Sequence, residues 1–103
     1  MSALIWCPFP DEDTAATAAT ALLDEKLIAC ANLLGPMRSV FEWNGERGDA
    51  REVGVLFKTH ASVLDLAVAR LAELHPYDTP AVLGWRCDAA APAAAQWLAA
   101  LAR

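Results

Sequence analysis

The pattern of apolar residues is typical of strands in some segments of the chain and of helices in others, and the two kinds of segment alternate. A short apolar run over residues 3–8 ends at Pro8 and Pro10, which is typical of a buried strand. Residues 11–14 provide capping and acidic side chains, and apolar residues at helical spacing follow them to about Lys26. The first quarter of the chain therefore predicts a strand and then a helix whose alanines let it lie close to a sheet.

The middle of the chain has the pattern of a long β-hairpin. Residues 30–43 predict one strand with a kink at residues 35–36. Residues 53–59 predict the return strand, because β-branched and aromatic side chains are frequent there. Asn44 and Gly45 lie between the two segments, and both residue types tolerate the positive φ that a tight hairpin turn needs.

The last part of the chain predicts a helix, a strand and a second helix. The pattern S-x-x-D at residues 62–65 resembles a capping box, with Asp in place of the usual Glu, and an apolar helical stripe follows it to Leu74. Residues 81–87 predict the fourth strand. Pro92 lies near the start of a final helix, where its missing N–H is harmless, and this helix is expected to reach Arg103.

The predicted order is strand, helix, strand, strand, helix, strand, followed by one further helix. This order is typical of the ferredoxin-like arrangement, so the predicted fold class is α+β, with an antiparallel sheet in one domain of residues 1–103. In that arrangement the first strand is central, between the third and the fourth, and the beginning of the fourth lies beside the end of the first. The topology predicts that Cys7 and His75 are neighbours across the sheet.

Composition adds an expectation of subunit contacts. Apolar residues make up 56% of the sequence and charged residues only 20%, which is a high apolar content for so small a protein. We expect the excess apolar surface to be buried between subunits; the alternative is that alanine merely inflates the count. The net charge is −5 and the basic residues are scattered, which argues against nucleic-acid binding.

The cysteines and the first residues bear on the compartment. Cys7, Cys30 and Cys87 form neither a C-x-x-C motif nor an even disulfide framework, and free thiols are typical of a reducing compartment. The first residues lack the charged and long apolar regions of a signal peptide, and no segment reaches the ~20 apolar residues of a membrane helix. We therefore expect a cytoplasmic protein without membrane association.

The most informative segment is residues 73–80, Glu-Leu-His-Pro-Tyr-Asp-Thr-Pro. Pro76 excludes His75 from helical geometry, and Pro80 stiffens the entry to the next segment. The imidazole of His75 and the phenol of Tyr77 are therefore held on a short, rigid connector. Such rigidity around polar rings indicates a binding or assembly role.

Cys7 and His75 are candidate metal ligands, because a thiolate and an imidazole together suit copper or zinc better than magnesium or calcium. Two protein ligands are too few for a tight closed site unless Asp78 or a neighbouring subunit helps. The alternatives without metal are that Cys7 is a small apolar residue in a core strand and that His75 caps the preceding helix. His60 is expected to be a solvated residue in the turn between strand and helix.

Catalytic motifs are missing from the chain, which has no Ser-His-Asp order, no Gly-rich phosphate loop and no nucleophile elbow. Glu52, Lys58, His75 and Tyr77 could form an acid–base cluster in a cleft between subunits. Such side chains exist in every protein of this size, and the simpler interpretation is that Glu52 and Lys58 are exposed or paired on strand faces. We expect no enzymatic activity.

Several motifs, in the right order along nearly the whole chain, resemble the CutA family of divalent-cation tolerance proteins. They are Glu73-Leu74-His75-Pro76-Tyr77-x-x-Pro80, Cys7-x-x-Pro10-Asp11, Leu27-Ile28-Ala29-Cys30-Ala31-Asn32, Ser39-Val40-Phe41-Glu42-Trp43-x-Gly45, Lys58-Thr59 and Trp97. Together they are far more specific than any one of them.

The resemblance implies a function in divalent-cation tolerance, chiefly towards copper, and a homotrimer whose long hairpins reach onto neighbouring subunits. It implies that the positions associated with copper are Cys7 and His75, with Pro76 holding the imidazole. Leu74 stands where some relatives have a second histidine, which removes a potential ligand. The protein would bind the ion weakly or signal through the assembled trimer. The apolar side chains beside the hairpin turn would be buried by assembly; they are Val40, Phe41 and Trp43.

A second function class comes from analogy with the PII signalling proteins, which are similar trimers that bind small effectors between subunits. By this fold-level analogy the chain is alternatively a scaffold or a sensor whose cleft, lined by Lys58, His75 and Tyr77, binds a small anion or metabolite. A basic cleft would favour the sensor, and a thiol-lined cleft would favour metal. Trp97 is expected to anchor the last helix against its own sheet or against a neighbour, while Trp6 and Trp85 are expected in the core or an interface.

Overall fold

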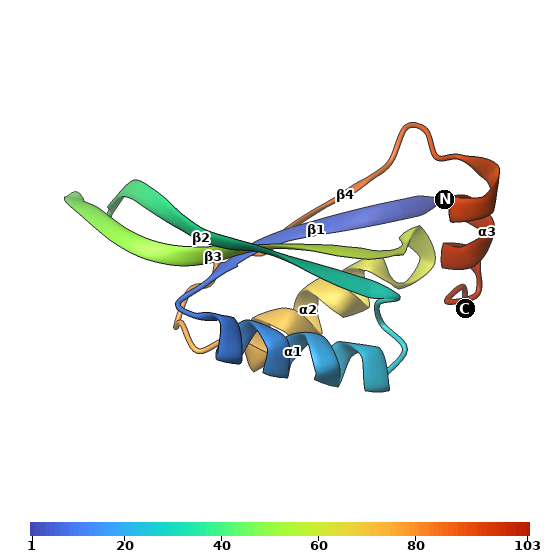
Figure 1. Ribbon diagram of the computed structural model, residues 1–103, viewed down its shortest axis with the longest axis horizontal. Helices are drawn as coiled ribbons and strands as arrows, with labels where there is room; N and C mark the ends of the chain where they lie inside the picture. Colours follow the sequence, from blue (N-terminus) through green and yellow to red (C-terminus); the bar gives the residue numbers. More distant parts are fainter.

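The computed structural model describes residues 1–103 as one four-stranded sheet with helices on one face and at one end (Figure 1). In chain order the elements are β1 (Ser2–Phe9), α1 (Glu12–Asp24), β2 (Cys30–Trp43), β3 (Glu46–His60), the 3₁₀ turn η1 (Ala61–Val63), α2 (Leu64–Leu74), β4 (Leu83–Arg86) and α3 (Pro92–Ala99). None of the helices is long and apolar enough to cross a membrane.

The sheet confirms the α+β, ferredoxin-like prediction. Its strand order is β2-β3-β1-β4, and every neighbouring pair is antiparallel, so β1 is central between β3 and β4. Helices α1 and α2 lie side by side beneath the sheet, while α3 lies at the end of the sheet where both chain termini are found (Figure 1). The additional C-terminal helix is therefore present, although it ends at Ala99 and does not reach Arg103.

The core lies between the sheet and the two helices beneath it. Burial alternates along β1, so that Ala3, Ile5, Cys7 and Phe9 are fully buried while the residues between them are partly exposed. This alternation follows from the opposite orientation of successive side chains in a strand. The partners of these positions on β3 and the inward alanines of α1 complete the same core; they are Val53, Val55, Phe57, Ala15, Ala18 and Ala19.

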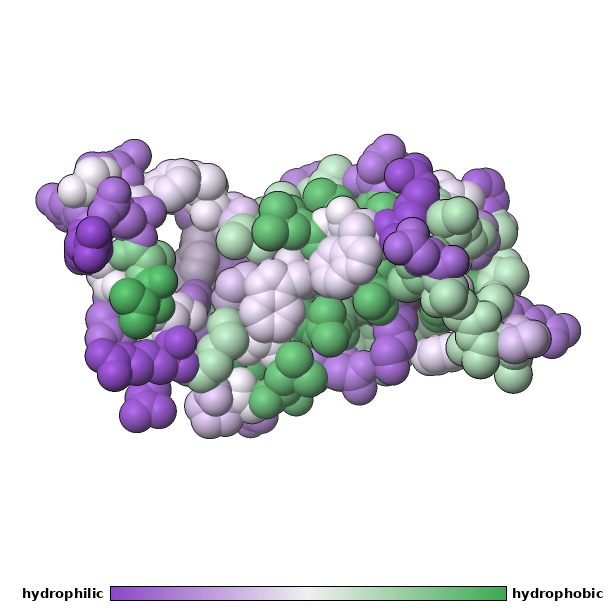
Figure 2. Space-filling model, turned by 90° about the horizontal axis from the view of Figure 1, so that it is seen from above, coloured by the Kyte–Doolittle hydropathy of each residue, from purple (hydrophilic) through white to green (hydrophobic).

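The other face of the sheet has no helix over it. Leu4 is paired with Trp85, and Trp6 with Leu83, which places all four side chains on the face opposite to the core. Figure 2 views this open face, where apolar side chains gather over the middle of the sheet and hydrophilic ones lie towards its ends. The chain therefore has a second apolar surface, which is exposed.

The β2–β3 hairpin projects well beyond the rest of the sheet (Figure 1). Asn44 and Gly45 have φ of 53° and 78°, which confirms the predicted turn. The register shift between Leu33 and Pro36 coincides with Gly35 at φ 85°, which confirms the predicted kink. The return strand was predicted too short, because it begins at Glu46 and its first residues are polar and project into solvent.

The predicted capping box is wrong. The side chain of His60 accepts a hydrogen bond from the Ser62 N–H and so caps η1, and α2 then begins without a side-chain cap. His60 therefore has a local structural role at the end of β3. The fourth strand is also shorter than predicted, since β4 covers only Leu83–Arg86.

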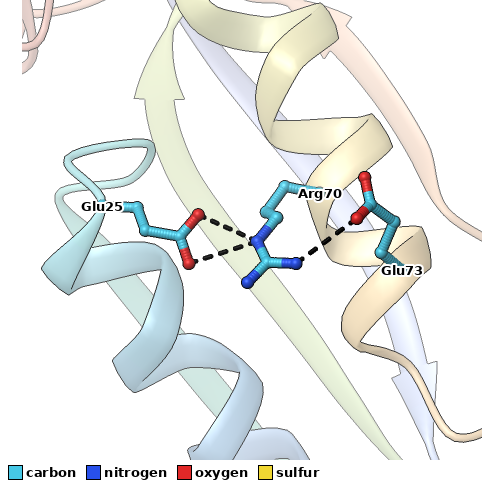
Figure 3. Close-up of polar contacts among 3 residues, drawn as sticks. All are labelled: Glu25, Arg70 and Glu73. Carbon is cyan, nitrogen blue, oxygen red and sulfur yellow. Dashed lines mark hydrogen bonds and ion pairs between the residues drawn. The ribbon is translucent and has the colours of Figure 1, made fainter.

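An ion-pair cluster joins the two helices beneath the sheet (Figure 3). Arg70 of α2 donates from Nε to Glu25 Oε1 at 2.8 Å, just after the end of α1, and its Nη1 lies 3.4 Å from Glu73 Oε2. These carboxylates raise the pKa of the Arg70 guanidinium. Because the cluster is solvent-exposed, it contributes little to stability. Its effect is to align the two helices.

Candidate functional site

The segment between α2 and β4 turns His75 out of the helix and towards the end of β1. His75 has φ −75° and ψ 140°, an extended conformation, while its N–H still donates to Leu71 O. Pro76 explains this geometry, because a residue before proline is disfavoured in the α region. His75 is thus the C-cap of α2, as one of the two sequence-based alternatives proposed, but its ring does not point at the helix end.

Both nitrogens of the His75 ring make hydrogen bonds. Nε2 lies 2.7 Å from Pro8 O, and Nδ1 lies 3.1 Å from the Tyr77 N. Since a carbonyl oxygen only accepts and a backbone N–H only donates, Nε2 carries the proton and Nδ1 is the acceptor. The ring also stacks on Phe9 with centroids 4.3 Å apart, and the residue is only 7% exposed. His75 is therefore a neutral imidazole whose hydrogen-bonding capacity is fully used.

Cys7 lies at the same carbonyl group from the other side. Its Sγ is 3.6 Å from Pro8 O, and the side chain is fully buried in the core. Burial, with a smaller contribution from the negative charge of Glu52, raises the pKa of the Cys7 thiol to about 12. The structure thus brings Cys7 and His75 together, as the topology predicts, but it holds the sulfur as a neutral thiol.

These residues do not fit a resident metal ion in the folded chain. Metal ligation needs an accessible sulfur and a free imidazole nitrogen, whereas the Cys7 side chain is fully buried and both nitrogens of His75 are engaged. The chain has no group of three His, Cys, Asp or Glu side chains arranged to hold a metal. Asp78 therefore does not join Cys7 and His75 in such a group, and it lines a cleft on the adjoining surface.

That cleft is the second feature of this region. It lies between the outer part of the hairpin and the connector that follows His75, and it has a volume of about 520 Å³. Its lining residues are Pro8, Ser39, Phe41, Glu42, Trp43, Glu52, Tyr77, Asp78, Thr79 and Ala81. The Tyr77 hydroxyl donates to Glu52 Oε2 at 2.8 Å and so joins the connector to β3. Partial burial and the carboxylate of Glu52 raise the pKa of Tyr77 to about 12.

The predicted acid–base cluster is not assembled in this chain. Lys58 lies six residues beyond Glu52 on β3, about 20 Å away at the usual rise of a strand, and it does not line the cleft. His75 is buried below the cleft and makes no contact with Lys58. Tyr77 and Glu52 are the two members that do meet.

Sequence reasoning missed Glu42 and Asp78 as parts of a common cleft. A signal was present on β2, where Ser39, Phe41 and Trp43 alternate and so share one face of the strand. Their proximity to Asp78 depends on how the hairpin and the connector meet, which no local pattern reveals. Trp97 is about half exposed on α3, so it is not buried in the core of its own subunit.

Comparison with known proteins gives the family. The profile of the family described as CutA1 divalent ion tolerance protein matches residues 3–100. This chain belongs to that family. It is 39% identical over 80 residues to the divalent-cation tolerance protein CutA of Pyrococcus horikoshii, which is 78% of each chain.

Solved CutA structures have the same fold. CutA1 of Ehrlichia chaffeensis superposes with a TM-score of 0.90 at 30% identity, covering 97% of this chain and 94% of the other. The structure described as the periplasmic divalent cation tolerance protein CutA of Archaeoglobus fulgidus gives a TM-score of 0.91 at 26% identity, covering 98% of both chains. The CutA resemblance seen in the sequence motifs is therefore confirmed.

Proposed function

We propose that this CutA chain acts in divalent-cation tolerance as a homotrimer and without catalysis. The observation that carries the proposal is the open apolar face of the sheet, in a chain whose family is named for divalent-cation tolerance. A monomer would leave this face in water, whereas assembled copies would bury it. In this proposal the active form is therefore an assembly.

Exposed side chains at two places and the two open edges of the sheet support assembly. Leu83 and Trp85 are exposed on β4, and Trp43 is 58% exposed near the tip of the hairpin. Burying one such side chain stabilises a complex by roughly 1.5–3 kcal/mol. Strands β2 and β4 are also the edges of the sheet, and their unpaired backbone groups can accept a strand from another copy.

The absence of catalysis is supported by the chemistry of the region around His75. No nucleophile here is paired with a base, since the Cys7 thiol bonds to a carbonyl and His75 is saturated by two backbone groups. The raised pKa of Tyr77 makes its hydroxyl a poor proton donor at neutral pH. A protein that binds, assembles or signals needs neither a nucleophile paired with a base nor a proton donor.

Weak copper binding through Cys7 and His75 stays a prediction. It requires that the connector move, that the bond from His75 Nε2 to Pro8 O break and that the thiol lose its proton. Each requirement lowers affinity, so any copper would be held weakly and with an accompanying conformational change. A cytoplasmic location also stays a prediction, resting on the free thiols, although the Archaeoglobus fulgidus relative is described as periplasmic.

Native mass spectrometry of the reduced protein tests both the trimer and copper binding through Cys7. Spectra are recorded with and without one equivalent of copper per chain. We expect a species of three times the 11.0 kDa chain mass. Leu83→Ser should shift the population towards monomer, whereas Leu66→Ser should not. The two leucines are 62% and 57% exposed, but Leu66 lies on the outer side of α2. A wild-type monomer would contradict the trimer, and equal copper retention by wild type and Cys7→Ser would contradict binding through Cys7.

A small-ligand sensor is the second candidate function, favoured by the 520 Å³ cleft beside Tyr77. Its volume is in the range of small-molecule sites. Its lining contains no lysine, arginine or histidine, so it offers no complementary charge to an anion. The ligand class must therefore differ from the anion that the sequence analogy suggested.

A further inference from the structure

We propose that the cleft between the hairpin and the connector binds an organic cation of the aliphatic polyamine class. This inference rests on the small-ligand alternative above and is independent of metal binding at Cys7 and His75. Most residues that line the cleft carry an aromatic ring or a carboxylate. These two kinds of side chain together recognise alkylammonium groups.

Aromatic rings form the walls of the cleft. Phe41 and Trp43 come from β2, and Tyr77 faces them from the connector. Phe41 lies directly over its cross-strand partner Gly48, where even a single added Cβ would collide with the ring. Tyr77 is held by its hydrogen bond to Glu52. The position of the Tyr77 ring is therefore set before any ligand arrives, which favours binding.

Two carboxylates, those of Glu52 and Asp78, give the cleft its negative charge. Asp78 has no ion-pair partner, and Glu52 accepts a hydrogen bond only from the neutral Tyr77 hydroxyl. Glu42 also borders the cleft, but its side chain alternates with Phe41 and Trp43 on β2 and pairs with Arg47. The charges of Glu52 and Asp78 are thus uncompensated within the chain. A ligand that carries several positive charges would neutralise them.

The spacing of these carboxylates selects an extended cation over a metal ion. No three acidic, histidine or cysteine side chains converge closely enough to coordinate one metal. A polyamine separates its ammonium groups by methylene chains, so that each can meet a different carboxylate while the methylenes lie against the aromatic walls. Both the charges and the apolar surface of the cleft are then used by the same molecule.

The cleft opens on the same face as the surface that we propose to be covered in the trimer. Its β3 residue Glu52 and its β1 residue Pro8 are on the open face, in register with Met37 and Gly54. A neighbouring copy would therefore border the cleft, and the ligand would lie between subunits. Binding must be measured on the assembled protein for this reason.

Isothermal titration calorimetry of the full chain with spermidine, at fixed ionic strength, tests the proposal. We expect saturable binding of one spermidine per chain, with no comparable binding of the uncharged 1,7-heptanediol or of citrate. Asp78→Asn should weaken the affinity about three- to fivefold, as expected for one partly screened charge. Asp24→Asn removes the same charge from the exposed end of α1 and should leave the affinity unchanged.

The aromatic wall is tested separately by Trp43→Leu, which should weaken spermidine binding about two- to tenfold. Trp97→Leu, a similarly exposed tryptophan on α3, is its control. Absence of binding to wild-type protein would overturn the inference. Equal losses of spermidine affinity in Asp78→Asn and Asp24→Asn would overturn it as well. Displacement of bound spermidine by magnesium, added at the same concentration of positive charge, would also overturn it, because both results indicate unspecific electrostatic attraction. The mass of each sample, measured alongside, shows separately whether the trimer itself is present.

Discussion

His75 Nε2 donates a 2.7 Å hydrogen bond to the carbonyl oxygen of Pro8, 67 residues earlier in the chain. The bond joins the connector after α2 to the end of the central strand. Because Nδ1 accepts from the Tyr77 N–H, the same ring also fixes the fold of the connector itself. A residue that the motifs mark as a metal ligand is therefore a structural bridge in the free chain.

Replacing His75 by phenylalanine should destabilise the fold by about 2–4 kcal/mol. The aromatic contact with Phe9 can persist, but the Tyr77 N–H loses its partner and Pro8 O keeps only the weak bond from the Cys7 thiol. An unpaired buried polar group costs about 1–3 kcal/mol. Guanidinium unfolding at one fixed protein concentration measures the difference. His60→Phe is the control, since the hydrogen bonds of His60 to Ser62 and to the amino group of Met1 are all exposed, and its loss should be smaller. Equal losses in the two variants would contradict the bridging role.

Cys7 should be the least reactive of the three cysteines. Its thiol is fully buried and its pKa is raised to about 12, so almost no thiolate exists at pH 8, whereas Cys30 and Cys87 are partly exposed. Brief treatment with iodoacetamide at pH 8, followed by peptide mass spectrometry, should find the label on Cys87 and Cys30 before Cys7. In denaturant all three should react alike. Native labelling of Cys7 as fast as Cys87 would show that the end of β1 opens readily.

The raised pKa of Cys7 also predicts a loss of stability at alkaline pH. The unfolded thiol titrates near 9.0 and the folded one near 12, so between these values the unfolded chain has released a proton that the folded chain keeps. The free energy of unfolding should therefore fall as pH rises from about 9 to about 12, by up to about 1.4 kcal/mol per pH unit for this one group. Tyr77 should add a smaller loss between pH 10 and 12, because it is 38% exposed.

Unfolding measured at several pH values tests this dependence. Cys7→Ala is expected to be less stable than wild type at pH 7. Its free energy of unfolding should fall less steeply than that of wild type above pH 9. Cys87→Ala should keep the wild-type slope. An unchanged slope in Cys7→Ala would mean that other groups cause the alkaline loss.

The sequence predicted the fold where one local pattern was decisive. A short apolar run ended by prolines identified β1, and Asn44-Gly45 identified the hairpin turn, since few other residue pairs adopt positive φ at both positions. The outer half of β3 was missed because residues 46–52 are mostly polar on both faces. That arm of the hairpin projects from the sheet, so no core imposes an apolar period on it.

The candidate site could be predicted only in part. Strand order alone placed Cys7 near His75, and this proximity is observed at Pro8 O. Whether the two side chains were available to a metal depended on hydrogen bonds with backbone groups, which have no signature in the sequence. The cleft likewise required the hairpin and the connector to meet, so that Glu42 and Asp78 became part of one surface.

The contact between Phe41 and Gly48 should couple hairpin conformation to assembly and to ligand binding. Gly48→Ala would push the Phe41 ring off its partner strand, because the added Cβ would collide with that ring. The ring is partly exposed and can swing outward, so we expect less than about 1 kcal/mol of lost fold stability, together with weaker trimer association and weaker spermidine binding. Sedimentation equilibrium and calorimetry measure the two losses. Phe41→Leu should weaken both as well, and the double variant should lose little more than either single one, since both changes remove the same contact. Losses that simply add in the double variant would show that Gly48 and Phe41 act independently.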